Sequence, residues 1–108
     1  MHSPELLKGT LQTIVLKVLK DHGKMYGYEI TQRVKELSEG TILLTEGALY
    51  PALHKLESEG LVESFEEIEK GRPRRNYSIT ESGRAVLAKD RAEWRELSRA
   101  VTTILGEA

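Results

Sequence analysis

Four positive charges lie within six residues of this chain, in Lys70-Gly71-Arg72-Pro73-Arg74-Arg75. Guanidinium groups donate hydrogen bonds in a planar array that matches phosphate oxygens, and the glycine and proline are typical of a turn. A solvated loop is the usual alternative for such a cluster, but this one is entirely basic and follows a candidate DNA-reading helix. We therefore expect Arg72, Arg74 and Arg75 to contact phosphates, and one of them can enter a minor groove, whose negative potential favours arginine.

A second candidate group lies earlier in the chain, on a segment that is predicted to be helical. One face of this helix is apolar, while the other carries small, aromatic and hydrogen-bonding side chains. A helix that enters the major groove of double-stranded DNA needs small residues for close approach and polar groups beyond them. The alternative for Tyr50 and His54 is a half-exposed amphipathic surface. The DNA-binding residues predicted on this face are Gly47, Tyr50, Pro51, His54 and Lys55.

Apolar residues at helical spacing, with capping residues before them, predict the elements that position these groups. Thr45 and Thr80 are each followed by a glutamate and are predicted helix N-caps. The helices are expected from about Pro4 or Glu5 to His22, Gly27 to Ser38, Glu46 to Glu59 and Glu81 to Leu105. The strands are expected at Thr41–Leu44, Leu61–Ile68 and Asn76–Ile79, with the basic cluster as the tip of the last hairpin.

This order of elements predicts a winged helix-turn-helix, a mainly α domain with a small β-hairpin wing, followed by a long C-terminal helix. The third helix would read the major groove, and the wing would lie beside it. We find no linker rich in Pro, Gly or Ser. Residues 1–80 are expected to form the DNA-binding domain, and residues 81–108 a C-terminal dimerisation helix, in one compact unit.

The last helix carries an apolar seam that is interrupted only by Asp90. Such a seam at the end of a chain is usually buried against a partner. The alternative is that it folds back on the first helix of the same chain, and both arrangements are compatible with a homodimer. The seam expected at the dimer interface comprises Leu87, Trp94, Leu97, Val101 and Ile104.

The overall composition limits the classes of function. The net charge is −1, from 16 basic and 17 acidic residues, so we expect modest, salt-sensitive DNA binding that depends on the local basic patch. The three histidines are scattered, and neither metal-ligand spacing nor a catalytic or cofactor-binding motif is present. We expect no metal, no cofactor and no enzymatic activity. With no signal peptide and no membrane-spanning stretch, the expected location is the cytoplasm.

Five stretches of the sequence, in this order and spacing, resemble the PadR-like transcriptional regulators over about Leu6 to Leu105. Each stretch alone is a weak signal, whereas the five together are highly specific. Ala48 departs from the pattern, since the family more often has threonine before Leu-Tyr-Pro. The stretches are Tyr26-Gly27-Tyr28-Glu29-Ile30, Gly47-Ala48-Leu49-Tyr50-Pro51-Ala52-Leu53, Glu59-Gly60-Leu61-Val62, Gly71-Arg72-Pro73-Arg74 and Tyr77-Ser78-Ile79-Thr80-Glu81-Ser82-Gly83.

The resemblance implies a homodimeric repressor that recognises an inverted-repeat operator. It implies DNA contacts at Tyr50, its helical neighbours and the wing, with dimerisation through a single C-terminal helix. It also implies that an aromatic effector can bind at the dimer interface against Trp94, although simple packing of this side chain is an equal alternative. A winged-helix module that binds another protein and not DNA is the competing function, because the strand before the wing is rich in glutamate.

Overall fold

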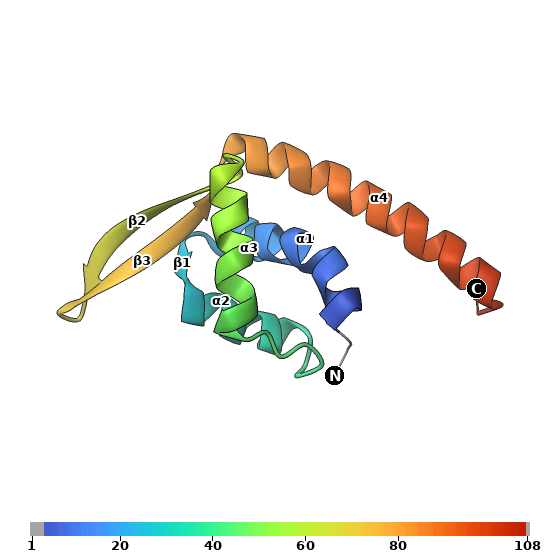
Figure 1. Ribbon diagram of the computed structural model, residues 1–108, viewed down its shortest axis with the longest axis horizontal. Coiled ribbons are helices and arrows are strands. Elements are labelled where there is room, and N and C mark those ends of the chain that lie inside the picture. Colours follow the sequence, from blue (N-terminus) through green and yellow to red (C-terminus); the bar gives the residue numbers. More distant parts are fainter. Residues whose placement is uncertain (1–3, 108) are drawn as a thin grey trace.

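The computed structural model describes residues 4–107 as helices packed with a small antiparallel sheet (Figure 1). The sheet has the strand order β1-β3-β2. None of the helices in this described range is long and apolar enough to cross a bilayer. The helices are α1 (Pro4–His22), α2 (Gly27–Leu37), α3 (Glu46–Ser58) and α4 (Glu81–Leu105), and the strands are β1 (Met25–Tyr26), β2 (Val62–Glu69) and β3 (Arg72–Ile79).

Both predicted N-caps are confirmed. Thr45 Oγ1 accepts a hydrogen bond from the backbone N–H of Ala48 at 3.1 Å, and Thr80 Oγ1 accepts one from Gly83 at 3.0 Å. Each cap satisfies one of the N–H groups that the first turn of a helix leaves without an intrahelical partner. These two threonines define the starts of α3 and α4, and all four helices end within one residue of the predicted positions.

The strand predicted at Thr41–Leu44 is wrong. This segment is an irregular connection in which Leu44 is buried in the core and Ser38 Oγ accepts a hydrogen bond from the N–H of Ile42 at 3.0 Å. Leu44 therefore anchors a loop, Leu43 is exposed, and the segment does not extend the sheet. The edge of β3 is paired with β1 instead, through the register positions Met25↔Tyr77 and Tyr26↔Asn76.

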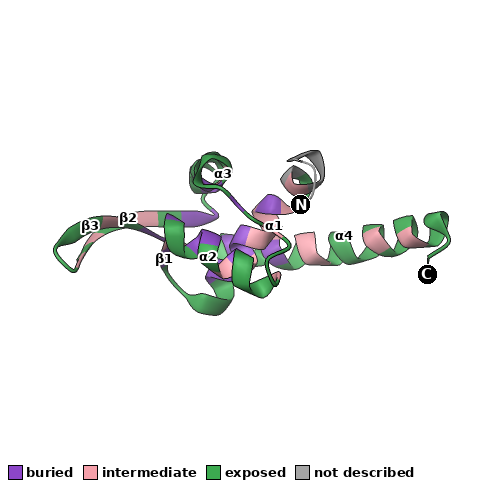
Figure 2. Cartoon of the chain, turned by 90° about the horizontal axis from the view of Figure 1, so that it is seen from below, coloured by how far each residue is buried: buried purple, intermediate pink, exposed green. Residues whose placement is uncertain are grey.

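The core lies between α1, α2, α3 and the root of the wing, as the buried colouring in Figure 2 shows. Apolar residues on the inward stripe of each helix meet there, and Val62 and Tyr77 add the inward face of the sheet. The outer part of the wing and the second half of α4 are mostly exposed. The most deeply buried side chains include Val15, Leu16, Leu19, Ile30, Leu49, Leu53, Leu56, Val62, Asn76 and Leu87.

The turn of the wing is shorter than the basic cluster. Only Lys70 and Gly71 lie outside the paired strands, with positive φ angles of 50° and 76°. Positive φ at both central residues is the requirement of a two-residue type I′ hairpin, whose twist matches that of the strands. The second strand therefore begins at Arg72 and not at Asn76, so the three arginines belong to a strand and not to a loop.

The first turn of α4 packs directly on the chain segment that leads into β2. A Cβ atom added at Gly83 would lie 2.1 Å from the carbonyl oxygen of Leu61 and 2.7 Å from Ile79 Cγ1. The same carbonyl accepts a hydrogen bond from the N–H of Thr80 at 3.1 Å. From this junction α4 extends away from the body of the domain, opposite to the wing (Figure 1).

We expect Gly83→Ala to destabilise the fold by about 1–3 kcal/mol, because overpacking against backbone cannot be relieved by a side-chain rotation. Thermal or denaturant unfolding measures the effect. Gly9→Ala is the matched control in α1, since a Cβ there meets nothing within 4 Å and alanine favours a helix over glycine. Equal stability of the two variants would contradict the packing described for this junction.

Candidate nucleic-acid interface

The exposed face of α3 brings together the residues predicted from the sequence. Leu49, Leu53 and Leu56 point into the core and are at most 1% exposed. The opposite side of the helix is left to solvent, as its amphipathic pattern requires. All five predicted members of this face are exposed, namely Gly47, Tyr50, Pro51, His54 and Lys55.

Tyr50 also makes an intramolecular contact that the sequence did not predict. Its hydroxyl lies where a Cβ of Gly27 would be, only 2.3 Å from that hypothetical atom, so the ring reaches from α3 to the first residue of α2. The hydroxyl donates to Glu46 Oε1 at 3.4 Å. Burial, and then the Glu46 carboxylate, raises the pKa of Tyr50 above its ordinary value. The hydroxyl therefore stays protonated and can act as a hydrogen-bond donor.

The hairpin register divides the three wing arginines between the two faces of the sheet. Successive residues of a strand point to opposite faces, so Arg72 and Arg74 share one face and Arg75 lies on the other. Arg75 donates to Ser64 Oγ at 2.9 Å and lies 3.6 Å from Glu66 Oε2. Ser64 in turn donates to Glu57 Oε2 of α3 at 2.5 Å, which places Arg75 on the face nearest to α3.

Arg74 stacks on an aromatic ring within the domain. Its Cζ atom lies 4.2 Å from the centroid of the Tyr26 ring, a cation–π distance. The side chain is partly buried, and its Nε has no hydrogen-bond partner within residues 4–107. The stacking contact therefore helps to hold this guanidinium in place. Arg72, two residues nearer the turn, is exposed.

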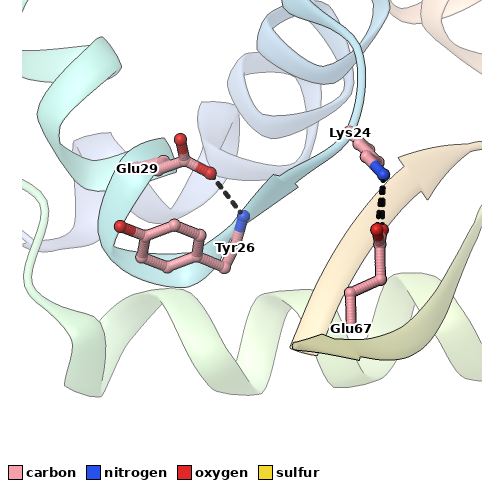
Figure 3. Close-up of polar contacts among 4 residues, drawn as sticks. All are labelled: Lys24, Tyr26, Glu29 and Glu67. Atoms are coloured by element: carbon pink, nitrogen blue, oxygen red, sulfur yellow. Dashed lines mark hydrogen bonds and ion pairs between the residues drawn. The ribbon is translucent and has the colours of Figure 1, made fainter. Parts of the chain in front are cut away.

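A second cation connects the wing to the segment before α2 (Figure 3). Lys24 Nζ donates to both carboxylate oxygens of Glu67 at 2.5 and 2.7 Å, and it lies 5.7 Å from the centroid of the Phe65 ring. Next to it, the N–H of Tyr26 donates to Glu29 Oε1 at 3.1 Å at the start of α2. A single lysine before a two-residue strand belongs to no recognisable sequence pattern, so the contact of Lys24 with the wing could not be predicted.

The apolar seam of α4 is largely exposed in the single chain. Trp94, Leu97, Val101 and Ile104 are between 43% and 81% exposed. Leu87 requires a correction, because it is only 1% exposed and belongs to the core of its own chain. It therefore presents no surface to a partner, and the exposed seam begins after it.

The polar position that interrupts this seam faces α1. Asp90 Oδ2 accepts long hydrogen bonds of 3.5 Å from Gln12 Nε2 and Thr13 Oγ1. The first part of α4 therefore packs on the chain's own first helix, whereas the later part leaves it. Between the two helices lies an open groove of about 1190 Å³, whose lining includes Leu7, Thr10, Ile14, Trp94 and Leu97.

Comparison with known proteins identifies this arrangement. Residues 15–89, from within α1 to within α4, match the model of the transcriptional regulator PadR-like family. Transcriptional regulator Rv3488 of Mycobacterium tuberculosis is 42% identical over 78 residues, which cover 72% of this chain and 70% of that protein. A transcriptional regulator from Clostridium thermocellum has a similar structure, with a TM-score of 0.86 at 27% identity over 95% of this chain and 97% of the other.

A PadR family transcriptional regulator from Eggerthella lenta is also similar, with a TM-score of 0.80 at 34% identity over 96% of this chain and 88% of the other. The two structural matches extend over the wing and the long last helix, and they confirm the predicted winged helix-turn-helix fold. The chain belongs to the PadR-like family of transcriptional regulators.

Proposed function

We propose that this regulator acts as a homodimeric repressor of an inverted-repeat operator in double-stranded DNA. The observation that carries the proposal is the exposed face of α3, where small, aromatic and cationic groups lie together opposite a buried leucine stripe. An α-helix with such a face fits the major groove of B-DNA. Membership of a family of transcriptional regulators supports the same function.

Each group has a distinct role in this proposal. Gly47 allows the start of α3 to approach the bases closely, and the Tyr50 hydroxyl, whose single proton points to Glu46 in the free chain, would turn to donate to a phosphate or a base edge. His54 extends the same surface, whereas Lys55 lies at its edge, where it also lines the groove between α1 and α4. We assign the phosphate contacts of the wing to Arg72, which is exposed, and to Arg75, which would exchange its exposed contacts with Ser64 and Glu66 for phosphate, because Arg74 is partly buried against Tyr26.

The dimer interface in this proposal is the exposed seam of α4. In the dimer, the same residues of a second copy would cover Trp94, Leu97, Val101 and Ile104 and exclude water from them. Burial of this apolar surface would stabilise the dimer by about 25 cal/mol for each Å². A two-fold arrangement then presents two α3 helices to successive major grooves, about 34 Å apart on one side of the duplex. An inverted-repeat operator matches this symmetry.

The groove between α1 and α4 suggests how an effector could act. It is lined on one side by Trp94, whose large ring is 53% exposed and suited to stacking. A flat aromatic compound bound there would alter the separation of the two α3 helices. Since that separation must match the DNA repeat, such a change would release the operator.

Replacing Arg72 and Arg75 together with methionine should weaken binding to DNA from upstream of the protein's own gene. Removing one phosphate contact reduces the slope of log K against log salt by about 0.9, so we expect a decrease of about 1.8 for the pair. Mobility shift at several salt concentrations measures it, with Lys35→Ala on the far end of α2 as the control. An unchanged slope would place the phosphate contacts elsewhere, and wild-type protein that binds no DNA at low salt would favour the protein-interaction module.

Introducing charge into the seam should separate the two copies. We expect Val101→Glu with Ile104→Glu to convert a dimer into a monomer in sedimentation equilibrium, because two pairs of carboxylates would have to be buried without partners. Thr103→Glu adds a charge on the opposite face of α4 and should leave the dimer intact. A wild-type protein that stays monomeric at high concentration would refute the proposed assembly.

Aromatic effectors should quench the emission of Trp94, which is the only tryptophan of the chain. Titration of planar compounds against the protein measures this directly, and the same compounds should lower operator affinity in parallel. Quenching without any change in DNA affinity would mean that the groove binds the compounds but does not control the operator.

A further inference from the structure

The wing is joined to the rest of the domain over only a short length of backbone. β1 contributes two residues to the sheet, and they pair with Tyr77 and Asn76 at the root of β3. Beyond that point β2 and β3 pair only with each other, as far as Glu69↔Arg72. An isolated two-stranded hairpin is marginally stable in water. The direction of the outer wing therefore depends on side-chain contacts at its root.

Two cations supply such contacts, and both involve the same end of the chain segment before α2. Arg74 of β3 lies 4.2 Å from the ring of Tyr26 in β1. Lys24, directly before β1, reaches Glu67 and Phe65 of β2. Glu67 is the cross-strand neighbour of Arg74. The two contacts therefore act at the same level of the hairpin and hold both of its strands.

The Tyr26 end of this connection is itself firmly held. Tyr26 is the N-cap residue of α2, and its N–H donates to Glu29 Oε1. The next residue, Gly27, is covered by the Tyr50 side chain of α3. A guanidinium stacked on Tyr26 is therefore connected to the starts of both α2 and α3, the helices that the wing must align with.

We infer that Arg74 is a positioning residue, whose stacking on Tyr26 fixes the direction of the wing relative to α2 and α3. Arg74 supports DNA binding, which rests on the proposed function, by orienting the wing through its contact with Tyr26. It makes no phosphate contact of its own. The three wing arginines thus have different roles. Arg72 and Arg75 contact the operator, whereas Arg74 holds the hairpin that carries them.

The first test uses the protein without DNA. A cation–π contact of this kind is worth a factor of about 3 to 30, so Arg74→Met and Tyr26→Leu should each reduce the hydrogen-exchange protection of amides in residues 66–74 by about that factor. Tyr26→Phe keeps the ring and should preserve protection. Arg72→Met, on the same face but nearer the turn, should preserve it too. Unchanged protection in Arg74→Met would overturn the inference, and unfolding curves verify that each variant is folded.

The second test uses operator DNA at several salt concentrations. Arg74→Met and Tyr26→Leu should lower the affinity for DNA equally and change the salt slope equally. The double variant should bind DNA as tightly as the single variant with the lower affinity, because both substitutions remove the same contact. A slope reduced by about 0.9 in Arg74→Met but unchanged in Tyr26→Leu would identify a direct phosphate contact and overturn the inference. If the wild-type protein binds no DNA, the proposed function fails, while the hydrogen-exchange result still decides the role of Arg74.

Discussion

The close approach of Gly83 to the Leu61 carbonyl is the constraint on which the rest of the architecture depends. At this point the end of α3, the start of β2, the end of β3 and the start of α4 meet within a few residues. Thr80 reinforces the junction, since its backbone N–H donates to the carbonyl oxygen of Leu61 and its hydroxyl donates to that of Gly60 at 2.7 Å. The wing and α4 leave this junction in opposite directions (Figure 1), so its geometry orients both of the surfaces that the domain presents.

Local signals in the sequence were sufficient for the helices. Thr45 and Thr80 act as caps through atoms within three residues of themselves, and apolar periodicity shows which side of each helix is buried. Strand pairing depends on partners that are distant in the chain. The segment Thr41–Leu44 has strand-like composition but pairs with no strand of the described chain, whereas Met25–Tyr26 is too short for a pattern yet lies beside β3. The errors in the predicted fold therefore fall where tertiary contacts decide whether a segment pairs as a strand.

The candidate site divides in the same way. The exposed face of α3 could be predicted because helical spacing alone groups its members. The different environments of Arg74 and Arg75 could not be predicted, because they depend on the register of the hairpin. The turn lies at Lys70 and Gly71, so this register includes the arginines, which the sequence placed in the loop. Leu87 shows a related limit: an apolar seam does not reveal which of its positions is covered by the same chain.

The charge pattern of the wing has a consequence for how such a protein would search a chromosome. Every wing arginine has a glutamate directly across the hairpin, so the hairpin carries little net charge. In the proposed complex, Arg72 and Arg75 would still contact phosphates, but the facing glutamates would offset the long-range attraction of the wing to arbitrary DNA. In the proposed complex, such a wing would add to operator binding mainly through short-range contacts and little to the binding of bulk DNA. The cross-strand pairs are Glu66↔Arg75, Glu67↔Arg74 and Glu69↔Arg72.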